Sequence, residues 1–157
     1  MPTELAQLAS LYPELVHARA RLAEVTEATA STLTLVERRV AAFVTSTING
    51  AACCSSLLAR ELADLDAPRG LVDTIRRAAG RWTVSDDDRI AVIVDYAVAL
   101  TQNPEQIARS DIQRLRAVRL TDLDIVDLNN VVAYYNYVNR IANGLGLASE
   151  VPGTEPS

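Results

Sequence analysis

Two adjacent thiols are the side chains in this sequence that are best suited to chemistry. Cys53 and Cys54 are its only cysteines, and its single histidine, His17, stands far from them. A disulfide between neighbouring cysteines strains the peptide that joins them. A metal site needs ligands that surround the ion, which two adjacent cysteines do not supply. The pair therefore predicts neither a disulfide framework nor a metal centre, and we expect no cofactor.

The cysteines are expected on a helix that runs from about Ala52 to Leu65, because apolar residues recur there at helical spacing. This spacing places Cys54 on one stripe with Leu58, whereas Cys53 points about 100° away. Two interpretations of Cys54 stay open. It is either a small buried hydrophobe with a raised pKa or a nucleophilic, pocket-lining thiol.

Capping signals predict further helices on both sides of this segment. Thr34 and Glu37 form a capping-box pattern before a helix that ends at Asn49 and Gly50. Thr121 and Asp124 open a long helix in the same way. Other helices are expected at Pro13 to about Ala28, Leu71 to Ala79, after the cap Ser85 to Asp88 up to Thr101, and after Ser110-Asp111. The pattern predicts an all-α fold.

Composition agrees with one helical domain. The chain has 157 residues, of which 49% are hydrophobic and 22% charged, so a sizeable core can form. We expect a single domain over residues 1–150 and a disordered tail over 151–157. A net charge of −5 argues against nucleic-acid binding. Without a secretory signal or the roughly 20 apolar residues of a membrane span, we expect a cytoplasmic protein that binds no membrane.

Three segments carry a resemblance to a known family. They are Leu33-Thr34-x-x-Glu37-Arg38-Arg39, Thr47-Ile48-Asn49-Gly50, and the closing run Tyr134-Tyr135-Asn136-Tyr137-Val138-Asn139-Arg140-Ile141-Ala142-Asn143-Gly144-Leu145-Gly146. With them the chain resembles the carboxymuconolactone decarboxylase / alkylhydroperoxidase D superfamily, in its peroxidase-related branch. The resemblance covers roughly residues 10 to 150. It implies an alkylhydroperoxidase D-like helical bundle and a homo-oligomer, either a trimer or a hexamer.

The same resemblance implies a site whose peroxidase groups are missing. Peroxidatic members carry Glu, eleven residues, Cys, two residues, Cys, three residues, His, so that two thiols reduce a peroxide while the other groups relay a proton. With Cys54 as the second cysteine, the first cysteine becomes Ala51, the histidine becomes Leu58 and the glutamate becomes Arg39. We therefore expect no ordinary two-cysteine peroxidase chemistry.

The groups that remain have both structural and functional interpretations. Arg39 either is solvated or ion-paired, or faces the pocket and holds a carboxylate or enolate. The tyrosines of the closing run either pack the core and subunit contacts or donate hydrogen bonds into a pocket. The candidate catalytic residues are Arg39, Cys54, Tyr134 and Tyr137, and the candidate ligand contacts are Glu37, Cys53, Leu58 and Asn139.

Three functional hypotheses follow. The first is a cofactor-independent enzyme that decarboxylates, isomerises or cyclises a small organic acid or polyketide-like compound, with Arg39 holding the anion and a tyrosine moving the proton. The second is a non-catalytic binding or assembly subunit. The third is a single-thiol peroxidase that uses Cys54 with an external thiol. A closed, leucine-filled site favours the second, and an open cavity at Arg39 and the tyrosines favours the first.

Overall fold

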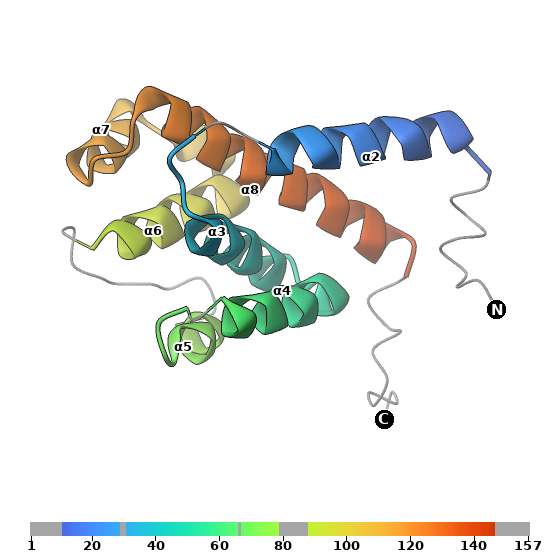
Figure 1. Cartoon of the computed structure of the whole chain (residues 1–157), viewed down its shortest axis with the longest axis horizontal. Coiled ribbons are helices and arrows are strands. Elements are labelled where there is room, and N and C mark those ends of the chain that lie inside the picture. Colours follow the sequence, from blue (N-terminus) through green and yellow to red (C-terminus); the bar gives the residue numbers. More distant parts are fainter. Residues whose placement is uncertain (1–10, 29–30, 66, 79–87, 147–157) are drawn as a thin grey trace. The chain divides into compact units, whose positions relative to one another are not determined.

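The computed structural model describes residues 11–28, 31–65, 67–78 and 88–146 (Figure 1). The chain divides into two compact units, residues 1–30 and 31–157. Every regular element within the described ranges is helical, which confirms the predicted all-α fold class. The expected domain boundary at residue 150 and the expected disordered tail both lie outside the described residues.

The described part of the first unit is one helix, α2 (Pro13–Glu27). Pro13 occupies the first turn, where its missing amide hydrogen costs nothing. Arg21 pairs with Glu24 one turn later, with 2.6 Å between Nη1 and Oε2. Leu15, Leu22 and Val25 recur at helical spacing and are exposed. The apolar spacing therefore predicted the helix and its bounds correctly, although these three side chains are not buried.

Helix α3 (Leu35–Ile48) lies at the centre of the second unit. It packs against α4 (Ala52–Asp64), α6 (Arg89–Gln102) and α8 (Asp122–Gly144), as Figure 1 shows. The segment from Val40 to Ser46 is buried on every side. A helix that neighbours surround in this way is the core of its domain. The side chains of α3 therefore meet those of α4, α6 and α8.

Both predicted capping boxes are present, and they lie side by side. The Thr34 amide donates to Glu37 Oε2 at 2.8 Å, and the Thr121 amide donates to Asp124 Oδ2 at 2.8 Å. The Thr32 amide, just before α3, donates to Asp124 Oδ1 at 2.6 Å. At the other end of α3, Asn143 Nδ2 donates to the carbonyl oxygen of Asn49 at 2.7 Å. Helices α3 and α8 consequently run in the same direction.

The smaller helices complete the second unit. They are α5 (Leu71–Ala78), the 3-10 turn η1 (Pro104–Gln106) and α7 (Arg109–Ala117). Helix α7 begins one residue before the predicted Ser110, because the carboxylate of Asp111 accepts the Ala108 amide at 2.8 Å. Asp88 caps α6 as predicted, through the amides of Ile90 and Ala91, whereas residues 85–87 lie outside the described residues.

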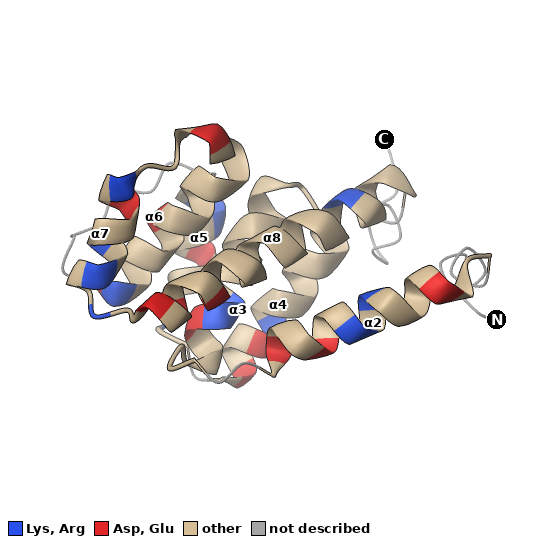
Figure 2. Ribbon diagram, turned by 90° about the horizontal axis from the view of Figure 1, so that it is seen from above, with Lys and Arg blue, Asp and Glu red and all other residues tan. Residues whose placement is uncertain are grey.

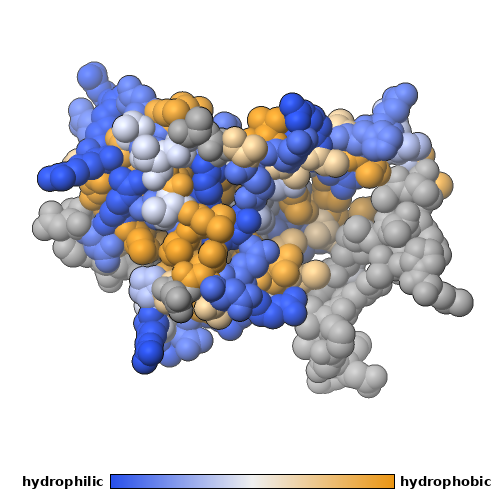
Figure 3. All heavy atoms as spheres, viewed as in Figure 1, coloured by the Kyte–Doolittle hydropathy of each residue, from blue (hydrophilic) through white to orange (hydrophobic). Residues whose placement is uncertain are grey.

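Charged and apolar side chains are unevenly distributed. In Figure 2 the ribbon of α8 is mostly uncharged, whereas charges gather on α7 and around the beginning of α3. In Figure 3 apolar side chains reach the surface between hydrophilic ones, and the lower edge, where α5 lies, is strongly hydrophilic. Within the described part of the chain, each helix is too short or too polar to cross a bilayer.

Candidate functional site

A tight turn places α4 directly against α3. Gly50 has a φ of +64°, in the left-handed region that favours glycine. The Ala51 amide then donates to the carbonyl oxygen of Ser46 at 3.0 Å, and α4 begins at the next residue. Ala51 and Leu58 are each 2% exposed. At the positions that the resemblance assigns to the first cysteine and the histidine, the structure therefore has buried apolar side chains.

The two thiols differ in exposure, and neither forms a disulfide. Cys53 is exposed, whereas Cys54 is half-buried. Burial raises the pKa of the Cys54 thiol, the neighbouring Cys53 raises it further, and a backbone hydrogen bond opposes both effects. At neutral pH Cys54 is therefore a thiol rather than a nucleophilic thiolate. In the described ranges, no three side chains of His, Cys, Asp or Glu gather into a metal site.

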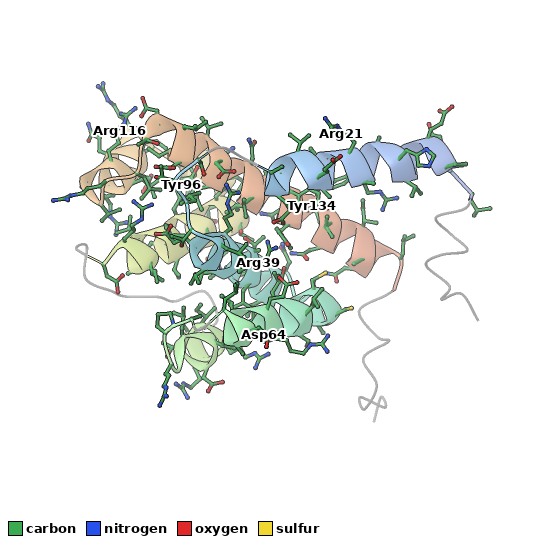
Figure 4. All side chains as sticks on the ribbon, in the orientation of Figure 1. Arg21, Arg39, Asp64, Tyr96, Arg116 and Tyr134 are labelled. Carbon is green, nitrogen blue, oxygen red and sulfur yellow. The ribbon has the colours of Figure 1, made fainter. Side chains whose placement is uncertain are left out.

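Arg39 forms an ion pair with a carboxylate of α4. Its Nε lies 2.6 Å from Oε2 of Glu61, and the two side chains are 17% and 37% exposed. Glu61 stands seven residues after Cys54, about two helical turns, so it shares a face of α4 with Cys54 and Leu58. Figure 4 shows Arg39 on α3, beside α4. An ion-paired Arg39 was one of the interpretations from the sequence, but its partner Glu61 was missed, although its spacing from Cys54 was an available signal.

Glu37, a predicted ligand contact, is held by two structural interactions. It is buried, and its carboxylate closes the capping box of α3. Arg89 of α6 also pairs with it, with Nε at 2.5 Å from Oε1. The same guanidinium donates to the carbonyl oxygen of Val118 at 3.3 Å. Glu37 thus joins the beginnings of α3 and α6 to the end of α7.

The tyrosines of the closing run lie along α8. Tyr134 packs edge-to-face against Tyr135, with ring centroids 5.5 Å apart and an interplanar angle of 87°. This is a favoured aromatic geometry. Tyr137 is exposed. Figure 4 shows Tyr134 on α8 and Arg39 on α3, at separate places in the bundle.

The asparagines of the closing run join three helices. Asn139 is fully buried, and its Oδ1 accepts a hydrogen bond from Ser46 Oγ at 3.2 Å. One turn earlier, Asn136 accepts from Asn49 Nδ2 at 2.9 Å and donates to Thr101 Oγ1 at 3.3 Å. These contacts link the ends of α3 and α6 to α8. They give Asn139 a structural role in addition to the predicted ligand contact.

This arrangement of helices is also found in solved structures of other proteins. No protein-family model matches the sequence, and no curated protein matches it. A solved structure of a protein of unknown function from Agrobacterium tumefaciens is 19% identical, covers 96% of both chains and has a TM-score of 0.75. The alkylhydroperoxidase AhpD core of a peroxidase-related protein from Ralstonia eutropha JMP134 is 20% identical, covers 87% of this chain and 71% of that one, and has a TM-score of 0.76. The chain has the alkylhydroperoxidase D-like fold.

A third solved structure shares this alkylhydroperoxidase D-like fold. It is an uncharacterised peroxidase-related protein from Silicibacter sp. TM1040, 26% identical, with a TM-score of 0.74. The match covers 85% of this chain and 69% of that one. The resemblance predicted from the capping segment and the closing run is thereby confirmed.

In this alkylhydroperoxidase D-like chain, the residue next to Arg39 on α3 also carries a charge. The structure buries Arg38 against α8, where it forms an ion pair with Asp127. Arg38 Nη1 lies 3.0 Å from Asp127 Oδ1, and Arg38 Nη2 donates to Ser31 Oγ at 3.0 Å. Ser31 in turn donates to Asp127. Sequence reasoning missed this pair because 89 residues separate its members.

A cavity lies elsewhere in the alkylhydroperoxidase D-like bundle, in a groove between α4 and α5. Its volume is about 680 Å³. None of the eight predicted site residues lines it. The lining residues are Ser56, Ala59, Arg60, Leu62, Ala63, Ala67, Pro68, Arg69, Gly70, Val72, Asp73 and Arg76. No sequence pattern predicted this groove, because only the turn before α5 brings its three arginines together.

Proposed function

We propose that this chain is a non-peroxidatic protein with the alkylhydroperoxidase D-like fold that binds a small molecule without thiol chemistry. One observation carries the proposal: on the α4 face that bears Cys54, a buried leucine occupies the position of the family's histidine. Leu58 is buried there, and Glu61 neutralises the charge of Arg39. This is the arrangement that the sequence associated with a non-catalytic binding or assembly subunit.

The chemistry of peroxide reduction supports the same conclusion. A thiolate must attack the O–O bond and become a sulfenic acid, which a second thiol then converts to a disulfide. Cys54 is the one thiol on this face, and its pKa is raised by burial. Ala51 offers no second thiol. The solved structures described as peroxidase-related therefore share the fold with this chain, and we infer that they do not share its chemistry.

Hydroperoxide turnover tests the proposal. With cumene hydroperoxide and dithiothreitol, we expect the wild-type chain to reduce the peroxide no faster than the Cys54→Ser variant. The reason is that neither has an activated thiolate or a resolving thiol. Peroxide consumption measures the rates, and Cys53→Ser is the matched control. Turnover that Cys54→Ser abolishes and Cys53→Ser retains would instead establish the single-thiol peroxidase.

A second candidate function is favoured by the partial exposure of one ion pair. Arg39 and Glu61 are reachable from solvent and share a face with Cys54. An organic acid that paired with Arg39 would displace Glu61 and leave it as a nearby proton acceptor. This supports the hypothesis of a cofactor-independent decarboxylation, isomerisation or cyclisation.

Substitution of Arg39 tests this candidate. With carboxymuconolactone as the probe, the Arg39→Ala variant of such an enzyme should turn over at least about tenfold more slowly than wild type, because a charged hydrogen bond is worth about 1.5–3 kcal/mol. Arg39→Lys should recover part of it. Chromatography of the remaining acid measures the rate. If wild type and Arg39→Ala both leave the acid unchanged, carboxymuconolactone turnover is excluded and non-catalytic binding remains the better proposal.

Self-association belongs to the same proposal. Leu123, Val126 and Tyr137 recur along one side of α8 and are exposed. Apolar residues that follow one face of a long helix often mark a contact with another protein. They support a homo-oligomer, which the sequence resemblance implied as a trimer or hexamer.

A further inference from the structure

The groove between α4 and α5 is distinct from the face on which the family's chemistry would occur. Cys54, Leu58 and Glu61 follow one side of α4. Ala63, nine residues after Cys54, is half a turn out of phase and lines the groove together with Arg60. A molecule in this groove would therefore touch neither the thiols nor the Arg39–Glu61 pair.

The groove is positively charged on a protein that is acidic overall. Arg60 of α4, Arg69 of the connecting turn and Arg76 of α5 line it, and Asp73 is the one carboxylate in its lining. All four side chains are exposed. Among the described residues, no carboxylate forms an ion pair with any of these three guanidinium groups. The chain as a whole has a net charge of −5, so this charge is local to the groove.

The floor of the groove is apolar, and an aromatic ring positions one of its arginines. Leu62 is fully buried beneath it, and Ala59, Ala67 and Val72 add small apolar surfaces. The guanidinium of Arg76 lies over the ring of Phe43, 5.7 Å from its centroid. A cation over an aromatic face is attracted by the ring. Because Phe43 is fully buried in α3, this contact connects Arg76 to the core.

We propose that this groove binds an organic anion with a short apolar body, such as a medium-chain carboxylate. Guanidinium groups bind a carboxylate through paired, charge-assisted hydrogen bonds, and the apolar floor buries the chain. The volume of about 680 Å³ lies in the range of about 300–1,000 Å³ that is usual for small-molecule sites. The inference deepens the proposed binding function, because it names the site and the class of ligand.

Calorimetric titration of the full chain with decanoate tests the proposal. We expect Arg76→Gln to weaken decanoate binding about tenfold, because it removes a charged hydrogen bond. The group is exposed, so the effect is taken from the low end of the range for such bonds. Arg77→Gln is the matched control, since Arg77 is the next residue of α5, is also exposed and does not line the groove. Its affinity should equal that of wild type. Equal affinities of Arg76→Gln and Arg77→Gln would overturn the proposal.

Two further variants keep the test independent of Phe43. Arg60→Gln removes a different guanidinium from the one that lies over the Phe43 ring, and it should weaken decanoate binding in the same way. Asp73→Asn removes the competing negative charge and should strengthen it about twofold or more, an effect that general destabilisation would not produce. Unchanged affinity in both variants would contradict the charge-based mechanism.

The choice of probe separates the parts of the ligand chemistry. Decanoate should bind more tightly than inorganic phosphate, which lacks the apolar body, and more tightly than decanol, which lacks the charge. If phosphate binds as tightly as decanoate, the groove is a simple anion site. If decanol binds as tightly as decanoate, the groove is merely apolar. Either result overturns the proposal. If decanoate does not bind and the chain also reduces no hydroperoxide, only this ligand class is rejected. If the chain reduces hydroperoxide in a manner that depends on Cys54, the proposed function itself is rejected.

Discussion

Replacing Asp127 by alanine is expected to lower the free energy of unfolding by about 3–5 kcal/mol, the usual cost of leaving one buried charge without its partner. Arg38 and Asp127 are both buried, and their side chains form a two-point contact between α3 and α8. Removing the carboxylate leaves the Arg38 guanidinium inside the core. Ser31, which shares the contact, carries no charge that can compensate.

Chemical denaturation of wild type and Asp127→Ala measures this cost. Asp95→Ala is the matched control, because Asp95 pairs with Arg114 at 2.9 Å but both side chains are more exposed. Such pairs contribute about 0–1 kcal/mol. The double variant Arg38→Met, Asp127→Leu should recover most of the loss, since it removes both charges. Similar losses for Asp127→Ala and Asp95→Ala would show that burial of the pair does not determine its effect.

Acid should destabilise the chain through Asp124, and this is the second large effect. Burial alone raises the pKa of this carboxyl group, but hydrogen bonds from Thr121 and Thr32 outweigh it and bring the pKa to about 2, from an ordinary value of 3.8. A lowered pKa stabilises the fold fully above about pH 4. That contribution, about 2 kcal/mol, is lost as the pH falls through about 2.

Urea denaturation at pH 7 and at pH 2 isolates this contribution. At pH 7 we expect Asp124→Asn to be less stable than wild type, and at pH 2 the difference should shrink, because about half of the wild-type carboxylate is then protonated in the folded state. Thr32→Val, which keeps Asp124 and removes the hydroxyl bond at 2.9 Å, should show a smaller version of the same pH dependence. A difference between wild type and Asp124→Asn that is constant with pH would refute the assignment.

The helices were predictable because their signals are local. Thr34 with Glu37 and Thr121 with Asp124 satisfy backbone amides within one turn, so the sequence predicts both helix beginnings. The second role of Asp124, as the acceptor for Thr32, was not predictable. It depends on the approach of segments 92 residues apart, on which helix propensity has no bearing.

The candidate site was predictable only where residues share one helix. Spacing placed Cys54 and Leu58 on one stripe of α4, and the structure agrees that Leu58 is buried and Cys54 half-buried. The partner of Arg39 required the packing of α3 on α4, which spacing along one helix does not define. The same limit applies to the groove, because Arg60 and Arg76 belong to separate helices.

The parallel course of α3 and α8 has a consequence for the kinetics of folding. Thr32 meets Asp124 and Arg38 meets Asp127 across 92 and 89 residues. Closing a loop of that size carries an entropy cost before any contact compensates for it, so such contacts slow folding relative to local ones. During synthesis the core helix α3 emerges long before α8. Until α8 arrives, the guanidinium of Arg38 has no Asp127 to pair with and the apolar segment from Val40 to Val44 has no α8 to cover it.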